Sequence, residues 1–192
     1  ASSSFMRVIS GIYKGRRLKA VEGMQVRPTS DRLRETLFNV LSSSIEGSRF
    51  VDICAGTGAV GIEALSRGAA HVTFIEANRR AAQVLSENLA HCGITENVKV
   101  VNRDALSTLK YFGQHLLQFD YFYLDPPYDS ELYSQILWTL AKSKLIAEEG
   151  LVIVEHRKMH ELLPNYDYLR PYRQIRQGDS CLTLFSMERG IA

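Results

Sequence analysis

The sequence predicts an α/β fold with a doubly wound sheet, mostly parallel, that ends in an antiparallel C-terminal hairpin. Apolar, strand-like segments alternate five times with segments of helical periodicity along the chain. Two further strand-like segments, 172–175 and 181–187, flank a Gln-Gly-Asp turn and predict the hairpin. With 192 residues, of which 45% are hydrophobic, the chain suits one main domain with a small appendage.

Residues 1–49 form the predicted N-terminal extension and carry most of the positive charge. They hold nine Lys or Arg and four acids, a balance of +5, and the net charge of +2 leaves −3 for residues 50–192. Short apolar stretches broken by Gly11 and Gly15 predict a small hairpin over residues 6–20. A basic arm is typical of polyanion binding, although a solvated charged face also explains it. The candidates for nucleic-acid contact are Arg7, Lys14, Arg16, Arg17, Arg27 and Arg32.

A helix is predicted after Pro28. Thr29 or Ser30 can cap it, and Asp31 places negative charge in its first turn. Its apolar face, which we expect to pack on the core, consists of Leu33, Leu37, Val40 and Leu41. The same pattern leaves three arginines to face solvent, RNA or cofactor, namely Arg27, Arg32 and Arg34.

The first predicted strand of the main domain, residues 50–54, leads into a ligand-binding turn. The strand contains Asp52, and the glycine-rich turn after it is followed by a helix to about Arg67. Glycines in this context let the backbone approach a ligand closely. The turn also satisfies G-x-G-x-x-G, so a dinucleotide-binding fold is a real alternative. The candidates for cofactor binding here are Asp52, Ala55, Gly56 and Gly58, with Gly61 as the third glycine of the motif.

Glu76 ends the second predicted strand, residues 72–76. A carboxylate at that strand end can accept both ribose hydroxyls of an adenosine, in NAD and S-adenosylmethionine alike. Asn78 suits the cap of the next helix. The third strand, residues 98–101, precedes Asp104, which on its own is equally well explained as a helix cap.

Residues 120–129 carry the most specific chemistry. An aromatic and apolar strand stops at Asp125, because the two prolines that follow cannot donate to a sheet ladder. Asp125 should therefore end a central strand, at the edge where α/β sheets bind ligands. The Asp125 carboxylate and the Pro126 carbonyl suit an NH2 group, and Tyr128 can stack on the ring that carries it. The turn predicts a pocket for the exocyclic amine of a nucleobase, although a plain turn with a surface tyrosine is the alternative.

Cysteine and histidine usage predicts no metal site. The cysteines, Cys54, Cys92 and Cys181, lack metal spacing, and we expect Cys54 to be a small buried strand residue. His156 and His160 have i,i+4 spacing without a third ligand, so exposed helix histidines are expected. No apolar run is long enough to span a membrane, and no signal-peptide pattern is present. A cytoplasmic protein follows from these patterns.

The sequence Asp-Pro-Pro-Tyr at 125–128 resembles the catalytic motif of the amino-group methyltransferases that use S-adenosylmethionine. The wider chain, from about Arg7 to the final strands, resembles the bacterial family that methylates the N2 amine of a guanine in 16S (small-subunit) ribosomal RNA. The glycine turn and four N-terminal segments carry this resemblance: Arg7-Val8-Ile9-Ser10-Gly11, Gly15-Arg16-Arg17-Leu18, Arg27-Pro28-Thr29-Ser30-Asp31-Arg32 and Arg34-Glu35-Thr36-Leu37-Phe38-Asn39.

The resemblance implies a Rossmann-like class I S-adenosylmethionine-dependent methyltransferase over residues 50–192, with residues 1–49 facing RNA. It implies S-adenosylmethionine as cofactor and small-subunit rRNA, within an assembling 30S particle, as partner. In the family that it resembles, Asp104 would accept from the adenine amine and the adjoining backbone at Ala105 would contact the ring. Arg27 and Thr29 would border the cofactor site. Methyl transfer would be direct and in line, with Asp125 and Pro126 accepting the hydrogens of the amine.

Other functions remain open at this point. An adenine-N6 or other amino methyltransferase acting on DNA or large-subunit rRNA would use the same turn. An NAD-type oxidoreductase explains the glycine turn and Glu76 but gives the Pro-Pro turn no role. A non-catalytic RNA-binding protein explains the basic arm but neither small-molecule motif. A carbon-5 pyrimidine methyltransferase needs a nucleophilic cysteine, and no cysteine lies at or near the Pro-Pro turn.

Overall fold

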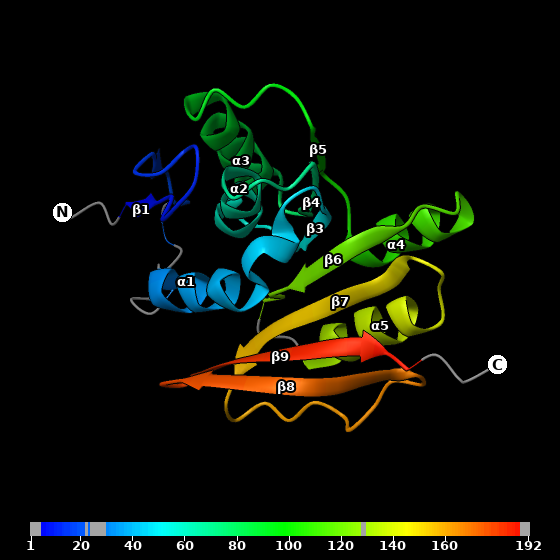
Figure 1. Cartoon of the computed structure of the whole chain (residues 1–192). Helices are drawn as coiled ribbons and strands as arrows, with labels where there is room; N and C mark the ends of the chain where they lie inside the picture. Colours follow the sequence, from blue (N-terminus) through cyan, green and yellow to red (C-terminus); the bar gives the residue numbers. More distant parts are fainter. Residues whose placement is uncertain (1–4, 22, 24–29, 128–129, 189–192) are drawn as a thin grey trace.

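The main sheet of the computed structural model has seven strands in the order β5-β4-β3-β6-β7-β9-β8 (Figure 1). The structure describes residues 5–21, 23, 30–127 and 130–188. Neighbouring strands from β5 to β7 pair in parallel, whereas β9 is antiparallel to both β7 and β8. This confirms the predicted fold class. The strands are β3 (Arg49–Ile53), β4 (His71–Ile75), β5 (Val98–Val101), β6 (Phe119–Leu124), β7 (Ile146–Arg157), β8 (Leu169–Gln177) and β9 (Ser180–Met187).

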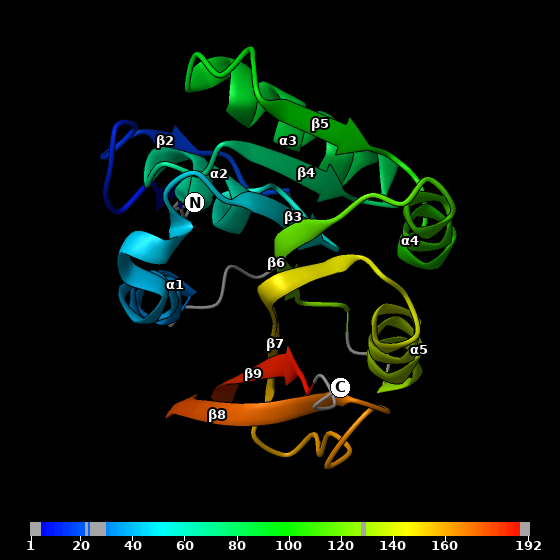
Figure 2. The same ribbon diagram turned by 45° about the vertical axis from the view of Figure 1, so that its right-hand side comes forward.

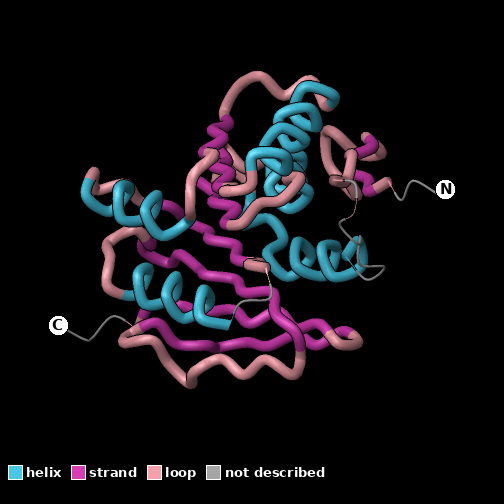
Figure 3. The backbone as a smooth tube through the Cα atoms, turned by 180° about the vertical axis from the view of Figure 1, so that it is seen from behind, coloured by secondary structure: helices cyan, strands magenta, loops and turns pink. Residues whose placement is uncertain are grey.

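Helices cover both faces of this sheet (Figure 2). One core packs the sheet against α1, α2 and α3, and the other packs it against α4 and α5. Figure 3 shows α4 and α5 together on their face of the sheet. The helices are α1 (Ser30–Leu41), which continues into a 3₁₀ turn, η1 (Ser42–Ile45), then α2 (Ala59–Ser66), α3 (Arg79–His91), α4 (Ala105–Gln114) and α5 (Ser130–Ala141). In the described part of the chain, no helix has the length and apolar character that crossing a membrane requires.

Side chains along the central strands alternate between the two cores. Tyr121 and Tyr123 of β6 belong to the core under α1 and α2, whereas Phe122 and Leu124 belong to the core under α4 and α5. The alternation follows from the two-residue period of a strand, and burial on both faces explains the continuous apolar run in the sequence. Residues two apart therefore share a face, which orients the polar residues that follow each strand.

The strand order reverses at β3, which lies between β4 and β6. The chain runs outward from β3 through β4 to β5 and then returns to place β6 on the other side of β3. In open α/β sheets, ligands bind at such a switch point, beyond the carboxyl ends of the strands. The residues after β3, β4, β6 and β7 are therefore the ones that the fold brings to a binding site.

A two-stranded hairpin precedes the main sheet, as predicted. Strands β1 (Met6–Arg7) and β2 (Arg17–Leu18) pair antiparallel. Two buried residues of α2 hold the loop between the hairpin strands. Glu63 accepts from the amides of Ile9 and Ser10 at 2.8 and 3.2 Å, and the Ser66 carbonyl accepts from the Ile12 amide at 2.9 Å. Hydrogen bonds to the body thus fix the position of the hairpin.

Gly11 makes this docking possible. Its φ is +87°, and a Cβ at this position would lie 1.8 Å from the Ser66 carbonyl oxygen. A side chain would therefore collide with the backbone of α2 and would also be strained in the left-handed region. The glycine of the Arg7–Gly11 segment has a packing role between the hairpin and the body.

The predicted helix after Pro28 corresponds to α1, whose Leu33, Leu37 and Leu41 are buried in the same core as Phe50 of β3. The proposed cap Thr29 lies outside the described residues. The division of the chain into residues 1–49 and 50–192 as separate domains stays a prediction, and the core that α1 shares with β3 shows how closely the two parts pack.

The expectation that Arg34 faces solvent is wrong, because its side chain is buried with 4% exposure. Its guanidinium donates to the Arg7 carbonyl and to Asp31, and Nε lies 3.7 Å from Glu63 Oε1. Burial lowers the pKa of Arg34, and the charges of Glu63 and Asp31 oppose that shift. Arg34 therefore joins α1, α2 and the hairpin. Arg32, by contrast, is exposed as expected.

The expectation of exposed helix histidines at 156 and 160 is also wrong. His156 lies in β7. Because β9 pairs with β7 as far as Arg157, β7 extends beyond its predicted end at residue 155. His156 is buried, with Nε2 2.7 Å from Thr183 Oγ1, and burial lowers its pKa. His160 is half-buried in the turn that follows.

Candidate active site

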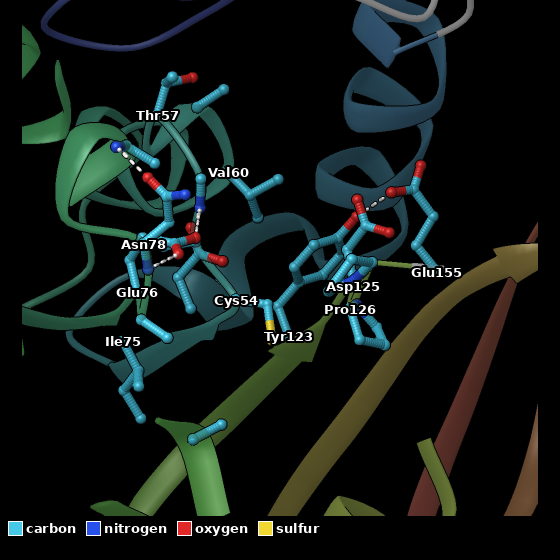
Figure 4. A pocket seen from close by; sticks show the side chains of 18 of the residues that line it. Cys54, Thr57, Val60, Ile75, Glu76, Asn78, Tyr123, Asp125, Pro126 and Glu155 are labelled. Atoms are coloured by element: carbon cyan, nitrogen blue, oxygen red, sulfur yellow. Dashed lines mark hydrogen bonds between the residues drawn. The ribbon is translucent and has the colours of Figure 1, made fainter. Parts of the chain in front are cut away.

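A cavity of about 850 Å³ opens beyond the carboxyl ends of β3, β4, β6 and β7 (Figure 4). It brings together most of the predicted cofactor and catalytic residues, which the chain spreads over more than 70 positions: Asp52, Ala55, Gly56, Glu76, Asp104, Ala105, Asp125 and Pro126. Tyr128 and Arg27 lie outside the described residues. The switch point of the sheet is therefore a pocket with a polar residue at the end of each strand.

The glycine turn after β3 leads directly into the first turn of α2. Three of its residues have left-handed backbone: Cys54, Gly56 and Gly58, with φ of 58°, 56° and 87°. A Cβ on Gly58 would lie 2.1 Å from Leu85 Cδ1, so the turn packs tightly against α3. At the start of a helix, the dipole favours electron-rich ligand atoms.

Asp52 supports this turn from inside the sheet. Its side chain is 2% exposed, and Oδ2 accepts from the Gly61 amide in the first turn of α2 at 3.0 Å. Burial raises the pKa of Asp52 well above its usual range, and the Gly61 hydrogen bond only partly opposes that shift. Asp52 lines the cavity, but the contact that the structure gives it is with the helix start.

Glu76 joins the glycine turn to the loop after β4. Its Oε1 accepts from the Gly56 amide at 2.8 Å and its Oε2 from the Asn78 amide at 2.7 Å (Figure 4). Asn78 itself caps α3, as predicted, by accepting from the Ala81 amide. Each carboxylate oxygen keeps a further lone pair. Glu76 is therefore oriented by two amides while still able to accept from two hydroxyls in the cavity.

Asp104 is the N-cap of α4 and also lines the cavity. It accepts from the Ser107 amide at 2.9 Å and from the Ser107 hydroxyl, and these two bonds, the hydroxyl first, lower its pKa. The helix-cap interpretation of Asp104 is thus confirmed. Its predicted contact with an adenine amine, and that of the adjoining Ala105 backbone, stay predictions that this geometry allows.

Asp125 follows the last residue of β6 and is half-buried at the cavity, beside the buried Pro126. The parallel register pairs Leu124, the last residue of β6, with Val154 of β7, so the next residues, Asp125 after β6 and Glu155 within β7, follow a paired position. The predicted contact of the aspartate carboxylate and the proline carbonyl with an NH2 group stays a prediction that this placement allows.

Glu155 is a cavity residue that the sequence reasoning missed. It is 8% exposed, its Oε2 accepts from the Tyr123 hydroxyl at 3.0 Å, and its backbone carbonyl accepts from the Tyr133 hydroxyl at 3.0 Å. Figure 4 shows its carboxylate on the same side of the pocket as Asp125. An acid at the end of a predicted strand was the signal used for Glu76, and the same signal marks Glu155.

Cys54 corrects two expectations. It lies in the turn after β3 rather than in a strand, is half-buried, and lines the same cavity as Asp125, so a cysteine does lie close to the Pro-Pro turn in space. Burial raises the pKa of its thiol to about 12, with the charges of Glu76, Asp125 and Asp52 adding to the shift. The thiol stays protonated and is a poor nucleophile.

The basic hairpin lies beside the mouth of the cavity. Met6, Ala20 and Val21 line the cavity, and Asn88 of α3 donates to the carbonyls of both Lys19 and Thr57 at 3.0 Å. The hairpin is therefore tied to the glycine turn. The predicted nucleic-acid residues within the described chain are exposed: Arg7, Lys14, Arg16, Arg17 and Arg32.

Comparisons with known proteins agree with this geometry. The chain is 40% identical over 156 residues to Ribosomal RNA small subunit methyltransferase D of Escherichia coli, covering 81% of this chain and 76% of that one. It is 38% identical over 160 residues to the protein of the same name from Haemophilus influenzae, covering 82% of each. The solved structure of yhhF from Escherichia coli, named as a methyltransferase, superposes with a TM-score of 0.85 at 32% identity, over 96% of this chain and 99% of that one.

The strand order, the antiparallel β9 and these neighbours place the chain among the class I methyltransferases, whose cofactor is S-adenosylmethionine. The NAD-type oxidoreductase alternative is therefore wrong. A family model described as Conserved hypothetical protein 95 matches residues 6–186, and the chain belongs to that family.

The cavity fits S-adenosylmethionine. Glu76 offers acceptors for a ribose, and Ile75, Ala77 and Leu106 give apolar walls for an adenine ring. Four acidic side chains line the cavity, those of Asp52, Glu76, Asp125 and Glu155. The acceptors of Glu76 and the apolar walls thus match the adenosine part of the cofactor.

Proposed function

We propose that this protein transfers a methyl group from S-adenosylmethionine to the exocyclic N2 amine of a guanine in 16S (small-subunit) rRNA, in the cytoplasm. One observation carries the proposal: the Asp125 carboxylate and Pro126 line the same cavity as Glu76 and the glycine turn. An amine acceptor site thus lies next to a nucleoside site. The names of the relatives, Ribosomal RNA small subunit methyltransferase D, support the choice of RNA.

The chain's residues act by holding the amine rather than by forming a bond to it. The lone pair of an aromatic amine is delocalised into the ring, so the free amine is a poor nucleophile. Asp125 and the Pro126 carbonyl accept its two hydrogens and favour a pyramidal nitrogen whose lone pair points toward the cofactor. The bound cofactor supplies the electrophilic methyl group. Asp125 is also placed to take the proton that the amine loses.

A covalent route through cysteine is disfavoured by the pKa of Cys54. A carbon-5 methyltransferase needs a thiolate. With a pKa of about 12, the Cys54 thiol is almost entirely protonated at neutral pH. Direct transfer to nitrogen needs no such group. Tyr128, next to Pro127 in the chain, would stack on the base after it leaves the RNA helix.

The hairpin supplies the RNA contact in this proposal. Arg16 and Arg17 are exposed. Hydrogen bonds from their segment to α2 and α3 hold it beside the cavity mouth. Phosphate contacts from such residues position a substrate without reading its sequence. An assembling 30S particle is the proposed form of the substrate, because a single small basic surface gives little sequence information by itself.

The deciding experiment incubates the purified protein with methyl-labelled S-adenosylmethionine and small-subunit particles from cells that lack the endogenous activity. The RNA is then digested to nucleosides. Label in N2-methylguanosine is the expected result, and its loss with Asp125→Ala is the matched control. Label in N6-methyladenosine would overturn the choice of base. Absence of label, with cofactor binding measured separately, would overturn the choice of substrate and direct the assay to DNA and large-subunit rRNA.

A further inference from the structure

A second carboxylate, Glu155, lies beside the amine site and has no part in the transfer described above. It lies near the end of β7, beside the end of β6 that Asp125 follows, and both residues line the cavity. Tyr123 of β6 and Ile153 of β7 belong to the same core, and Glu155, two residues after Ile153 in β7, faces that side as well. Asp125, just after β6, lines the same cavity. The cavity therefore presents two neighbouring acidic acceptors where a base would enter.

The chemical edges of the nucleobases differ next to the amine. In guanine, the N2 amine is adjacent to N1–H, which is a donor. In adenine, the N6 amine is adjacent to N1, and in cytosine the N4 amine is adjacent to N3; both ring nitrogens are acceptors. A carboxylate at this point accepts from N1–H of guanine and repels the lone pair of adenine or cytosine.

We propose that Glu155 is a specificity-determining residue that accepts a hydrogen bond from N1–H of the target guanine, while Asp125 and the Pro126 carbonyl hold the N2 amine. This inference rests on the proposed function. It assigns the choice of guanine to a named side chain of the catalytic cavity rather than to RNA position alone.

Tyr123 orients Glu155 for this contact. Its hydroxyl donates to Glu155 Oε2 at 3.0 Å, and this bond uses one of about four lone pairs that a carboxylate offers. Tyr123 is buried, and burial, followed by the charge of Glu155, raises its pKa well above its usual range. The hydroxyl therefore remains a donor at any physiological pH, and the carboxylate keeps acceptor capacity toward the cavity.

The test replaces Glu155 and the target base together. Once the methylated nucleotide is mapped, small-subunit particles are rebuilt with guanine or 2-aminopurine at that position. 2-Aminopurine keeps the reacting amine but has an acceptor at N1. In Glu155→Gln the side-chain oxygen accepts from Tyr123 and its NH2 group is left to face the base, where it suits 2-aminopurine and opposes N1–H.

For the wild-type protein we expect kcat/KM for guanine to exceed that for 2-aminopurine by about 100-fold or more, since a buried acceptor left unpaired is costly. In Glu155→Gln we expect this ratio of kcat/KM values to fall below about 10-fold, mainly because kcat/KM for guanine falls. Tyr123→Phe leaves the carboxylate but removes the hydroxyl that orients it, so we expect a preference between that of the wild type and that of Glu155→Gln.

An equal fall in kcat/KM on both substrates in Glu155→Gln would overturn the inference and assign Glu155 a structural role. A wild-type ratio near one would overturn it as well, while N2-methylguanosine formation would leave the proposed function intact. Label in adenosine would overturn the proposed function itself.

Should Glu155→Gln fail to fold, the wild-type protein gives a second measurement. Particles with inosine, which keeps N1–H, must then inhibit more strongly than particles with unsubstituted purine, and equal inhibition would overturn the inference.

Discussion

The two halves of the cavity are built by different kinds of contact. On the proposed cofactor side, backbone amides hold the carboxylates: Asp52 accepts from Gly61, and Glu76 from Gly56 and Asn78. On the proposed amine side, the Glu155 carboxylate accepts from Tyr123, which is 32 positions away and on another strand.

The difference follows from what each half must recognise. A glycine turn can bind a nucleoside through amides that any sequence supplies, so its residues are constrained mainly by backbone shape. An amine-bearing base is recognised by side-chain acceptors, and these depend on which strands the fold places side by side. Changes on the amine side should therefore alter the reaction, and changes on the cofactor side should alter binding.

The largest effect is expected from Asp125→Ala. Loss of an acceptor that acts on the reacting amine should lower the single-turnover rate by about 1,000-fold, the upper range for a single electrostatic group. The Kd for S-adenosylmethionine, measured by calorimetry, should stay within about threefold, because Asp125 is not among the groups that hold the nucleoside. A collapse of cofactor affinity would show that Asp125 belongs to the cofactor half.

Glu76→Ala is expected to have the opposite pattern. Two hydrogen bonds to a charged acceptor are lost, so the Kd for S-adenosylmethionine should rise by about 100-fold, with RNA affinity unchanged in a filter-binding assay. Because Glu76 also holds the Gly56 amide, the melting temperature of the variant is the control. Weakened RNA binding with unchanged cofactor affinity would contradict the division into halves.

Local pattern predicted the turns and caps around Glu76 well. The turn after β3, the acid after β4 and the Asn78 cap each depend on residues within a few positions of one another, and the Pro-Pro turn ends its strand by its own covalent geometry. The antiparallel edge was also predictable, because two strand segments joined by a short turn pair with each other.

The remaining features depend on contacts between distant segments. Arg34 is buried because Glu63 of α2 packs against it, and His156 is in a strand because β9 pairs with β7 past residue 155. Cys54 and Asp125 are 71 positions apart in the sequence but line one cavity, since β3 and β6 are neighbours. Strand order, which a single sequence does not specify, decides all such proximities.

A smaller effect is expected from Arg16→Gln combined with Arg17→Gln. Each lost phosphate contact should reduce the slope of log K against log salt by about one, with weaker affinity for all RNA sequences alike. The rate at saturating particle concentration should not change, because both residues lie outside the cavity. Arg173→Gln with Arg176→Gln on exposed positions of β8 is the charge-matched control. An unchanged slope in the hairpin variant would make the hairpin charge a solvated surface.

The smallest effect is expected from Cys54→Ala, although Cys54 lines the cavity. A thiol whose pKa is about 12 is neutral at pH 8, so it contributes neither a nucleophile nor a charge to the reaction. Replacing Cys54 with alanine removes only the packing contacts of the thiol. The rate of methyl transfer should therefore stay within about threefold of the wild-type rate. The raised pKa predicts that Cys54 reacts with iodoacetamide far more slowly at pH 8 than a free cysteine does, which peptide mass spectrometry can follow. Rapid alkylation at pH 8, together with loss of activity in Cys54→Ala, would instead indicate a thiolate and a covalent reaction on carbon. Because Cys54 is the cysteine that the fold brings beside the Pro-Pro turn, this comparison separates transfer to nitrogen from transfer to carbon within a single cavity.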